Sequence, residues 1–206
     1  MKLFLVRHGE SVYNRIRVHQ RPTTPLSSRG KKQARLVARE LGKVKPSIIL
    51  SSKYTRAMQT AQIIGRALGK KVVYTELLNE RKFPSEIAGK RAGALTAKIR
   101  RLEVKHIGDP SWHYSDDENE YELRSRALRA LRFIKGTGKR SVLVVTHGVF
   151  LRTMLTTILL GKDARPEDYV RVRHMFESRN TGITELEADE KGKWRLLTFN
   201  DYSHLR

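Results

Sequence analysis

Residues 3–11 read LFLVRHGES, and residues 141–148 read SVLVVTHG. Each stretch is a short apolar run, typical of a buried β-strand, that ends at a polar or basic residue and a His-Gly pair. In an open α/β sheet, ligands bind beyond the carboxyl ends of the strands. If the two strands are neighbours, His8 and His147 project into one site. A single His-Gly pair is weak evidence, since such a histidine is often structural. Two pairs, one of them beside Arg7, favour a shared catalytic site.

Strand-like and helix-like segments alternate along the rest of the chain. After Pro25, apolar residues at helical spacing predict a helix that begins at Ser27 or Ser28 and ends at Gly42. This alternation predicts an α/β fold with three α/β/α layers and a mainly parallel, mixed central sheet. The other predicted elements are strands at 47–50, 72–74, 170–176, 182–186 and 194–199, a hairpin turn at 190–192, and helices at 55–68 (closed by Gly69), 94–106, 121–134 and 149–160.

The middle of the chain, at about 83–125, is less regular. It contains prolines and glycines, one basic helical stretch, and the acidic run Asp116–Glu120. We expect this segment to be a short lid-like insertion over the core, within a single domain that spans residues 1–206.

Length and composition limit the class of protein. A chain of 206 residues can bury a core without a covalent staple, and the absence of cysteine excludes disulfides, thiolate metal sites and a thiol nucleophile. Neither a signal peptide nor a run of about 20 apolar residues is found. These features favour a soluble, cytoplasmic protein with no membrane partner.

The charge balance is strongly basic, with 42 lysines and arginines against 21 acidic residues, a formal charge of +21. Because the basic residues spread over residues 29–45, 90–105 and 124–140, a solvated surface is the plainest interpretation. A polyanion partner and the steering of a phosphorylated substrate are the alternatives. Nucleic acid is less favoured, since aromatic residues are few and do not interleave with the basic runs.

Arg7-His8-Gly9-Glu10-Ser11 resembles the phosphate-site signature of the histidine phosphatase superfamily, which includes the cofactor-dependent phosphoglycerate mutases. Further stretches similar to those of this family follow in the family's order. The resemblance reaches both ends of the chain and fails mainly across residues 83–125. The similar stretches are Asn14, Thr24–Gly30, Ser51–Ala61, Leu78–Arg81, Thr146–Gly148 and Asn200–Leu205.

The resemblance implies three catalytic residues. His8 is the expected nucleophile, which attacks phosphorus through an unprotonated ring nitrogen while an acceptor holds the other nitrogen. Glu80 is the expected proton donor, and His147 is the expected second histidine. The role of Glu80 requires a proton on its carboxyl group, or one supplied by the substrate's phosphate. The structural alternative for Glu80 is a salt bridge to Arg81 or Lys82.

Phosphate binding is expected from Arg7 and Arg56, because the planar guanidinium group presents paired donors to phosphate oxygens. Asn14 adds a neutral donor and His147 a further one. The alternatives are helix-end or surface pairing for the arginines and a turn cap for Asn14. The positive side chains supply the charge that a magnesium ion would supply, and no cluster has ligand spacing. We therefore expect no metal and no cofactor.

After Glu80 the sequence departs from the family. Pro84-Ser85-Glu86 stands where many members have a glycine-rich turn, and the following region is shorter than the lid that mutases use. Because a mutase must keep its intermediate away from water, we expect a metal-independent phosphatase that hydrolyses a phosphomonoester through a phosphohistidine on His8. The alternatives are a bisphosphoglycerate-dependent phosphoglycerate mutase and a non-catalytic, basic nucleic-acid- or protein-binding module. The expected partner is a phosphorylated small molecule whose identity the sequence does not give. The sequence also leaves open whether the protein forms a homodimer.

Overall fold

The computed structural model describes the backbone of residues 1–206 and every side chain except that of Lys162. Its six-stranded sheet has the order β3-β2-β4-β1-β5-β6. The first four of these strands are parallel to one another, β5 is antiparallel to β1, and β6 is antiparallel to β5. This confirms the mainly parallel, mixed sheet. The strands are β1 Lys2–Arg7, β2 Ile48–Ser52, β3 Val72–Thr75, β4 Ser141–Thr146, β5 Ile183–Ala188 and β6 Trp194–Asp201.

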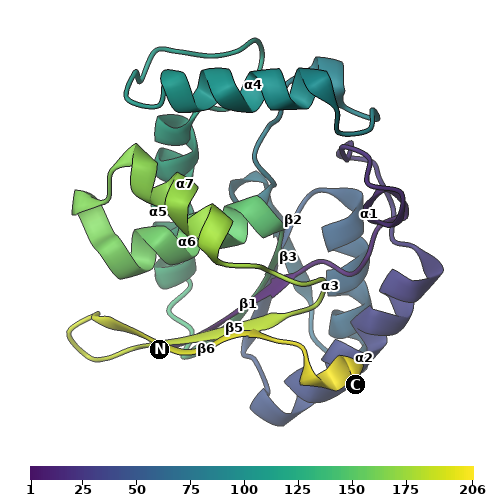
Figure 1. Ribbon diagram of the computed structural model, residues 1–206. Coiled ribbons are helices and arrows are strands. Elements are labelled where there is room, and N and C mark those ends of the chain that lie inside the picture. Colours follow the sequence, from purple (N-terminus) through teal and green to yellow (C-terminus); the bar gives the residue numbers. More distant parts are fainter.

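Helices cover both faces of the sheet, as expected for three layers (Figure 1). Because successive strand residues point to opposite faces, Leu3 and Leu5 of β1 pack in the cluster that contains α5 and α6. Phe4 and Val6 pack in the cluster that contains α2 and α3. The helices are α1 Val12–Arg15, α2 Ser28–Val44, α3 Thr55–Leu68, α4 Ala94–Lys105, α5 Glu120–Gly136, α6 Gly148–Leu160 and α7 Pro166–Met175.

The end of α2 differs from the prediction. Ser27 caps the helix as expected, but the helix continues through Gly42 to Val44, and its C-cap Lys45 has a left-handed backbone with φ 46°. Pro46 follows, and a proline disfavours the α conformation in the residue before it. The proline, rather than the glycine, therefore sets the boundary.

The strand predicted at 170–176 is wrong, since these residues belong to α7 apart from Phe176, which caps its end. Pro166 occupies the first turn, and the side chain of Asp168 accepts from the backbone N–H of Arg165 at 2.8 Å. These are strong helix-start features. They outweigh the apolar–polar alternation that suggested a strand.

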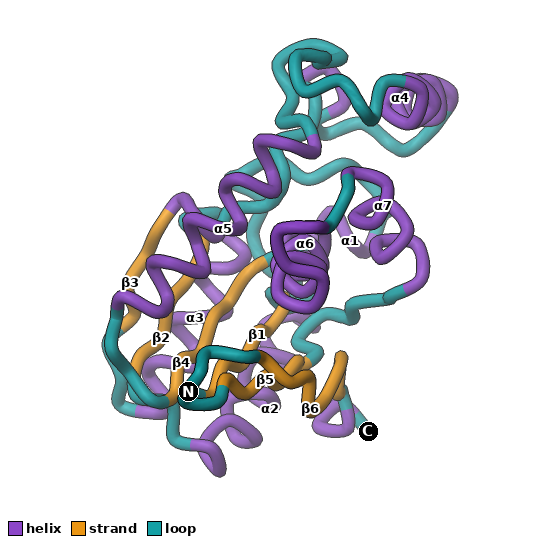
Figure 2. The backbone as a smooth tube through the Cα atoms, turned by 90° about the vertical axis from the view of Figure 1, so that its left-hand side faces the viewer, coloured by secondary structure: helices purple, strands orange, loops and turns teal.

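The middle segment stands apart from the sheet, beyond the core helices (Figures 1 and 2). Its helix α4 contacts the loop between α1 and α2, because His19 Nε2 and Thr96 Oγ1 lie 3.0 Å apart. The backbone N–H of Gly89 also donates to the His19 carbonyl at 2.8 Å. Among the described residues, no helix combines the length and apolar character needed to cross a bilayer.

Candidate active site

The two His-Gly pairs lie side by side because their strands are neighbours. β1 and β4 are parallel, with Arg7 opposite Thr146, so both strands end at the same edge of the sheet. The backbone N–H of His8 donates to the Thr146 carbonyl at 2.9 Å. As a result, the ring centroids of His8 and His147 are 5.1 Å apart.

The hydrogen bonds of His8 define its tautomer. Its Nδ1 lies 2.7 Å from the Gly9 carbonyl, which can only accept, so Nδ1 carries the proton. Its Nε2 accepts from Nε of Arg56 at 3.1 Å. Burial, followed by the charges of Arg56 and Arg7, holds the pKa of His8 well below its usual value. The ring is therefore neutral at pH 7, with an unprotonated Nε2.

Arg56 lies in the first turn of α3 and is only 2% exposed. Besides its bond to His8, its Nη1 donates to the Arg21 carbonyl at 3.0 Å. Burial lowers the pKa of Arg56 to about 10, so the group is still a cation at neutral pH. Helix α3 thus brings a buried positive charge to the imidazole of His8, rather than to a surface ion pair.

Arg7 ends β1 and lies beside the start of α6. Its Nη1 donates to the Ser178 carbonyl, while its Nε is buried and makes no hydrogen bond within the described residues. A Cβ atom at Gly148 would lie 3.4 Å from this Nε. Burial lowers the pKa of Arg7. A buried guanidinium with an unused donor is an incomplete site for an anion.

His147 is fully buried, and its Nε2 lies 2.7 Å from Oγ of Ser52. The Ser52 hydroxyl donates its proton to Oδ1 of Asn79 at 2.9 Å, so Nε2 of His147 must be the donor to Ser52. Its Nδ1 makes no hydrogen bond among the described residues. Burial, and then the charge of Arg56, keeps the pKa of His147 well below its usual value.

The carboxylate of Glu80 lies on the first turn of α6, which begins next to His147. Its Oε2 accepts from the N–H of Val149 at 3.1 Å, and its Oε1 from those of Phe150 at 2.9 Å and Arg81 at 3.0 Å. A carboxylate suits this position, because the first N–H groups of a helix lack internal partners. Neither side-chain salt bridge that we considered for Glu80 is formed. Arg81 instead pairs with Glu103, Asp117 and Glu120, and Lys82 with Asp116.

Asn14 does cap a turn, as one of the alternatives held. Its Oδ1 accepts from the N–H of Ser11 at 3.1 Å in a capping box at the start of α1. Nδ2 of Asn180 lies 3.4 Å from the same oxygen and donates to the His8 carbonyl at 2.9 Å. The cap uses the side-chain oxygen of Asn14 and not its amide N–H groups.

Sequence reasoning missed three residues that hold the site together, namely Ser52, Arg126 and Asn180. Ser52 lies inside the stretch 51–61, but only its hydroxyl contact with His147 gives it a role. Asn180 precedes β5, and the antiparallel pairing of β5 with β1 brings it to the end of β1. The polar run 178–181 was the available signal. Arg126 is one of many arginines on α5, and no sequence feature sets it apart.

Two cavities lie beside the segment that carries Glu80 and Arg81. The first, of about 420 Å³, lies under the insertion and includes Arg81, Val149 and Arg152 in its lining. The second, of about 650 Å³, is lined by polar residues that include Tyr54 and Glu80. His8, His147 and Arg56 line neither cavity. The second adjoins them through Tyr54, whose ring centroid is 5.3 Å from that of His147.

Comparisons with known proteins agree on one family. The family model described as histidine phosphatase superfamily (branch 1) matches residues 3–202. "Putative phosphoserine phosphatase 2" of Hydrogenobacter thermophilus is 31% identical over 100% of this chain and 98% of its own. "Probable phosphoglycerate mutase GpmB" of Photorhabdus laumondii is also 31% identical, over 100% and 95%.

Among solved structures, a phosphoserine phosphatase mutant from Entamoeba histolytica in complex with phosphoserine has a TM-score of 0.79 and 27% identity. The similarity covers 100% of this chain and 99% of that one. Sequence and fold thus point the same way along the whole chain. The chain belongs to the histidine phosphatase superfamily.

Proposed function

We propose that this protein is a metal-independent phosphatase that hydrolyses a phosphomonoester through a phosphohistidine on His8. One observation carries this proposal. The Gly9 carbonyl fixes the proton on Nδ1 of His8, so that Nε2 is an unprotonated nucleophile beside the Arg56 guanidinium. The phosphatase names of the similar proteins from H. thermophilus and E. histolytica support the same reaction class.

The proposed reaction has two steps at phosphorus. The phosphate group displaces the Arg56–His8 hydrogen bond, and its oxygens take donors from Arg7 and Arg56. The lone pair of His8 Nε2 forms the N–P bond while the P–O bond to the leaving group breaks. The leaving oxygen takes a proton from the carboxyl group of Glu80. Glu80 either holds this proton before the substrate binds or receives it from the substrate's phosphate.

In the second step, water attacks the phosphohistidine and gives its proton to Glu80. The P–N bond breaks, its electron pair returns to Nε2, and inorganic phosphate leaves. Glu80 lines the second cavity, so we place the leaving group of the substrate on that side of His8. The buried Nδ1 of His147 carries no proton, so it is a further candidate contact only as an acceptor from a P–OH group of the phosphate.

The mutase alternative has a specific observation in its favour, the 31% identity to the mutase-named protein of P. laumondii. It predicts conversion of 3-phosphoglycerate into 2-phosphoglycerate with bisphosphoglycerate as primer. The phosphatase predicts release of inorganic phosphate without a primer. A panel of phosphorylated metabolites, including phosphoserine, separates the two reactions and narrows the substrate.

The direct test measures hydrolysis of p-nitrophenyl phosphate in the presence of EDTA. Wild type should be active, and His8→Ala should lose nearly all activity. The matched control is His174→Ala, because His174 is exposed on α7, distant in sequence from the site motifs. Retained, chelator-resistant hydrolysis in His8→Ala would eliminate the mechanism. Loss of wild-type activity with EDTA would eliminate its independence from metal.

A further inference from the structure

The segment that carries Glu80 has no helix or strand of its own from Asn79 to Pro84. Its position therefore depends on hydrogen bonds to the elements around it. Oγ1 of Thr146, next to His147, donates to the Leu78 carbonyl at 2.8 Å. Three further backbone carbonyls at and before this segment, those of Leu77, Asn79 and Glu80, accept from one side chain, Arg126 of α5.

The guanidinium of Arg126 donates to three carbonyls within residues 77–80. Its Nη1 lies 2.7 Å from the Asn79 oxygen and 3.1 Å from the Leu77 oxygen. Its Nη2 lies 3.4 Å from the carbonyl oxygen of Glu80 itself. The side chain is only 12% exposed, so water does not replace these donors readily.

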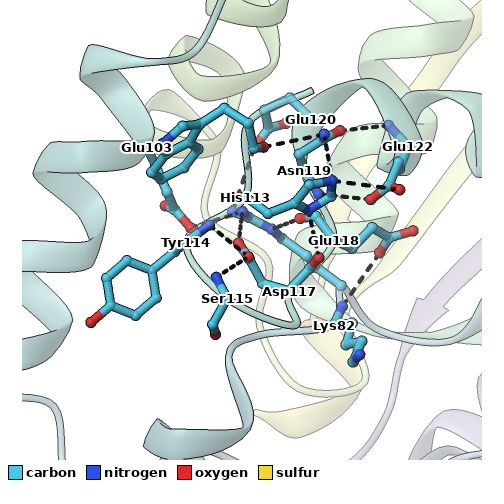
Figure 3. Close-up of polar contacts among 12 residues, drawn as sticks. Lys82, Glu103, His113, Tyr114, Ser115, Asp117, Glu118, Asn119, Glu120 and Glu122 are labelled. Carbon is cyan, nitrogen blue, oxygen red and sulfur yellow. Dashed lines mark hydrogen bonds and ion pairs between the residues drawn. The ribbon is translucent and has the colours of Figure 1, made fainter. Parts of the chain in front are cut away.

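Glu118 fixes the same guanidinium from the other side. Its two carboxylate oxygens accept from Nε and Nη2 of Arg126, both at 2.7 Å. The backbone of Glu118 pairs with Lys82, whose carbonyl accepts at 2.9 Å, and the Lys82 N–H lies 3.3 Å from the Glu118 carboxylate (Figure 3). A bidentate arginine–carboxylate pair has a defined geometry, so Arg126 and Glu118 together clamp residues 77–82.

Arg126 also reaches the helix on which the Glu80 carboxylate rests. Its guanidinium carbon lies 4.1 Å from the ring centroid of Phe150. The N–H of Phe150 is one of the donors to Glu80, at 2.9 Å. One side chain therefore contacts both the backbone of Glu80 and the first turn of α6 that holds its carboxylate.

We infer that Arg126 is a positioning residue for the proton transfer by Glu80, holding that carboxyl group in reach of the leaving oxygen. This inference rests on the proposed function. Lysine cannot substitute, because a single ammonium group cannot bond Glu118 in two places and also reach two carbonyls. Small displacements of a positioned catalytic group cost about 10²-fold in rate.

The test compares two substrates that differ in their need for an acid. The p-nitrophenolate ion leaves without a proton, whereas an alkoxide does not. The second substrate is therefore the alkyl phosphomonoester that wild type hydrolyses fastest. For Arg126→Met and Arg126→Lys, kcat/KM should fall about 10²-fold with the alkyl ester and within about 3-fold with p-nitrophenyl phosphate. Arg132→Met on the exposed side of α5 removes the same charge and should change neither value.

A double-mutant cycle with Glu80→Gln supplies the second readout. If Arg126 acts through Glu80, adding Arg126→Lys to Glu80→Gln should change the alkyl-ester rate less than about 3-fold. Thermal unfolding shows whether each variant is folded. If Arg126→Met does not fold, Arg126→Lys alone provides the comparison. Equal losses with both substrates, or multiplying effects in the cycle, overturn the inference while the phosphatase stands. A wild type that hydrolyses neither substrate overturns the proposed function itself.

Discussion

The imidazole of His8 makes one hydrogen bond with each ring nitrogen. A backbone carbonyl accepts from Nδ1, and a buried guanidinium donates to Nε2. The first contact selects the tautomer, and the second opposes protonation of the other nitrogen, because a positive charge beside the ring disfavours the imidazolium form. Both effects leave a lone pair on Nε2, which is the condition for nucleophilic attack on phosphorus.

Replacing Arg56 by lysine tests whether its fork, and not only its charge, is needed. Arg56→Lys keeps a cation but cannot bond His8 and the Arg21 carbonyl together, nor grip two phosphate oxygens. We expect kcat/KM for p-nitrophenyl phosphate to fall about 10²-fold or more. Arg66→Lys, on the exposed face of the same helix, is the control and should match wild type. Activity within about 3-fold of wild type in Arg56→Lys would contradict the role.

The lowered pKa of His8 also predicts how stability depends on pH. Above the unfolded-state pKa of about 6.5, the histidine is neutral in both states and adds no pH dependence. As the pH falls below that value, the unfolded chain binds the proton first, so the folded state loses stability. For one histidine, the free energy of unfolding can fall by at most about 1.4 kcal/mol per pH unit.

Urea unfolding at about pH 7 and about pH 5 measures this difference for wild type and His8→Asn. Acidic groups contribute to both proteins equally, so the comparison isolates the histidine. The variant should lose less free energy of unfolding on acidification than wild type does. Equal losses in the two proteins would show that the His8 pKa is not lowered by folding.

At the scale of elements, the loop after β1 is pressed against the start of α2. A Cβ atom on Gly30 would overlap the carbonyl group of Glu10, and one on Gly9 would lie 2.6 Å from the Gly30 carbonyl oxygen. Real Cβ atoms do not approach backbone so closely. The close approach of this loop and helix therefore requires glycine at both positions, and it sets the path of the chain on which His8 lies.

Two glycine-to-alanine substitutions in the same helix should consequently have opposite effects. At Gly42 a new Cβ meets only Cδ2 of Leu68, at 3.6 Å, so Gly42→Ala should raise the free energy of unfolding by up to about 1 kcal/mol. Gly30→Ala should lower it by about 1–3 kcal/mol, because the loop must move, and should reduce phosphatase activity. Denaturant unfolding measures both. A Gly30→Ala variant as stable and active as wild type would exclude the packing argument.

The elements that the sequence predicted well are those with both a period and a boundary residue. Helix α3 has its expected limits because Gly69, with φ 63°, closes it, and Ser27 caps α2 as expected. Residues 170–176 failed because their alternation is equally compatible with one face of a helix. Only the helix-start features at Pro166 and Asp168 distinguish the two.

Across the whole molecule, basic residues outnumber acidic ones two to one. Part of this charge is neutralised locally, for example where Arg81 meets three carboxylates that tie the insertion to the core. The other basic residues lie partly on surface helices, chiefly α2, α4 and α5, and partly in strands and connecting segments. A field of this sign attracts anions from a distance.

If this field steers the substrate, added salt should slow the association of the substrate and leave the rate of the chemical steps unchanged. The Debye length shrinks from about 30 Å at 0.01 M to about 8 Å at physiological ionic strength. Over that range, kcat/KM for a phosphomonoester should fall several-fold while kcat stays nearly constant. Steady-state kinetics at increasing NaCl give both values. A constant kcat/KM would mean that the basic surface has no part in substrate capture.

The sequence predicts the reactive and phosphate-binding residues of the site better than the residues that support them. His8, His147 and Arg7 follow from strands that end at one edge, and the family's motif order added Arg56 and Glu80. The bonds of Ser52, Asn180 and Arg126 come from segments that only the fold brings together. Their residue types are common, so no local pattern distinguishes them from other polar residues of the chain.

The central claim is that His8 carries the phosphoryl group during turnover. Rapid quenching with alkali during hydrolysis, followed by peptide mass analysis, tests it directly, since phosphohistidine survives alkali and is lost in acid. We predict one acid-labile phosphoryl group on the peptide that contains His8, absent from His8→Ala. A phosphoryl group on another residue, or turnover by His8→Ala at the wild-type rate, would contradict the claim.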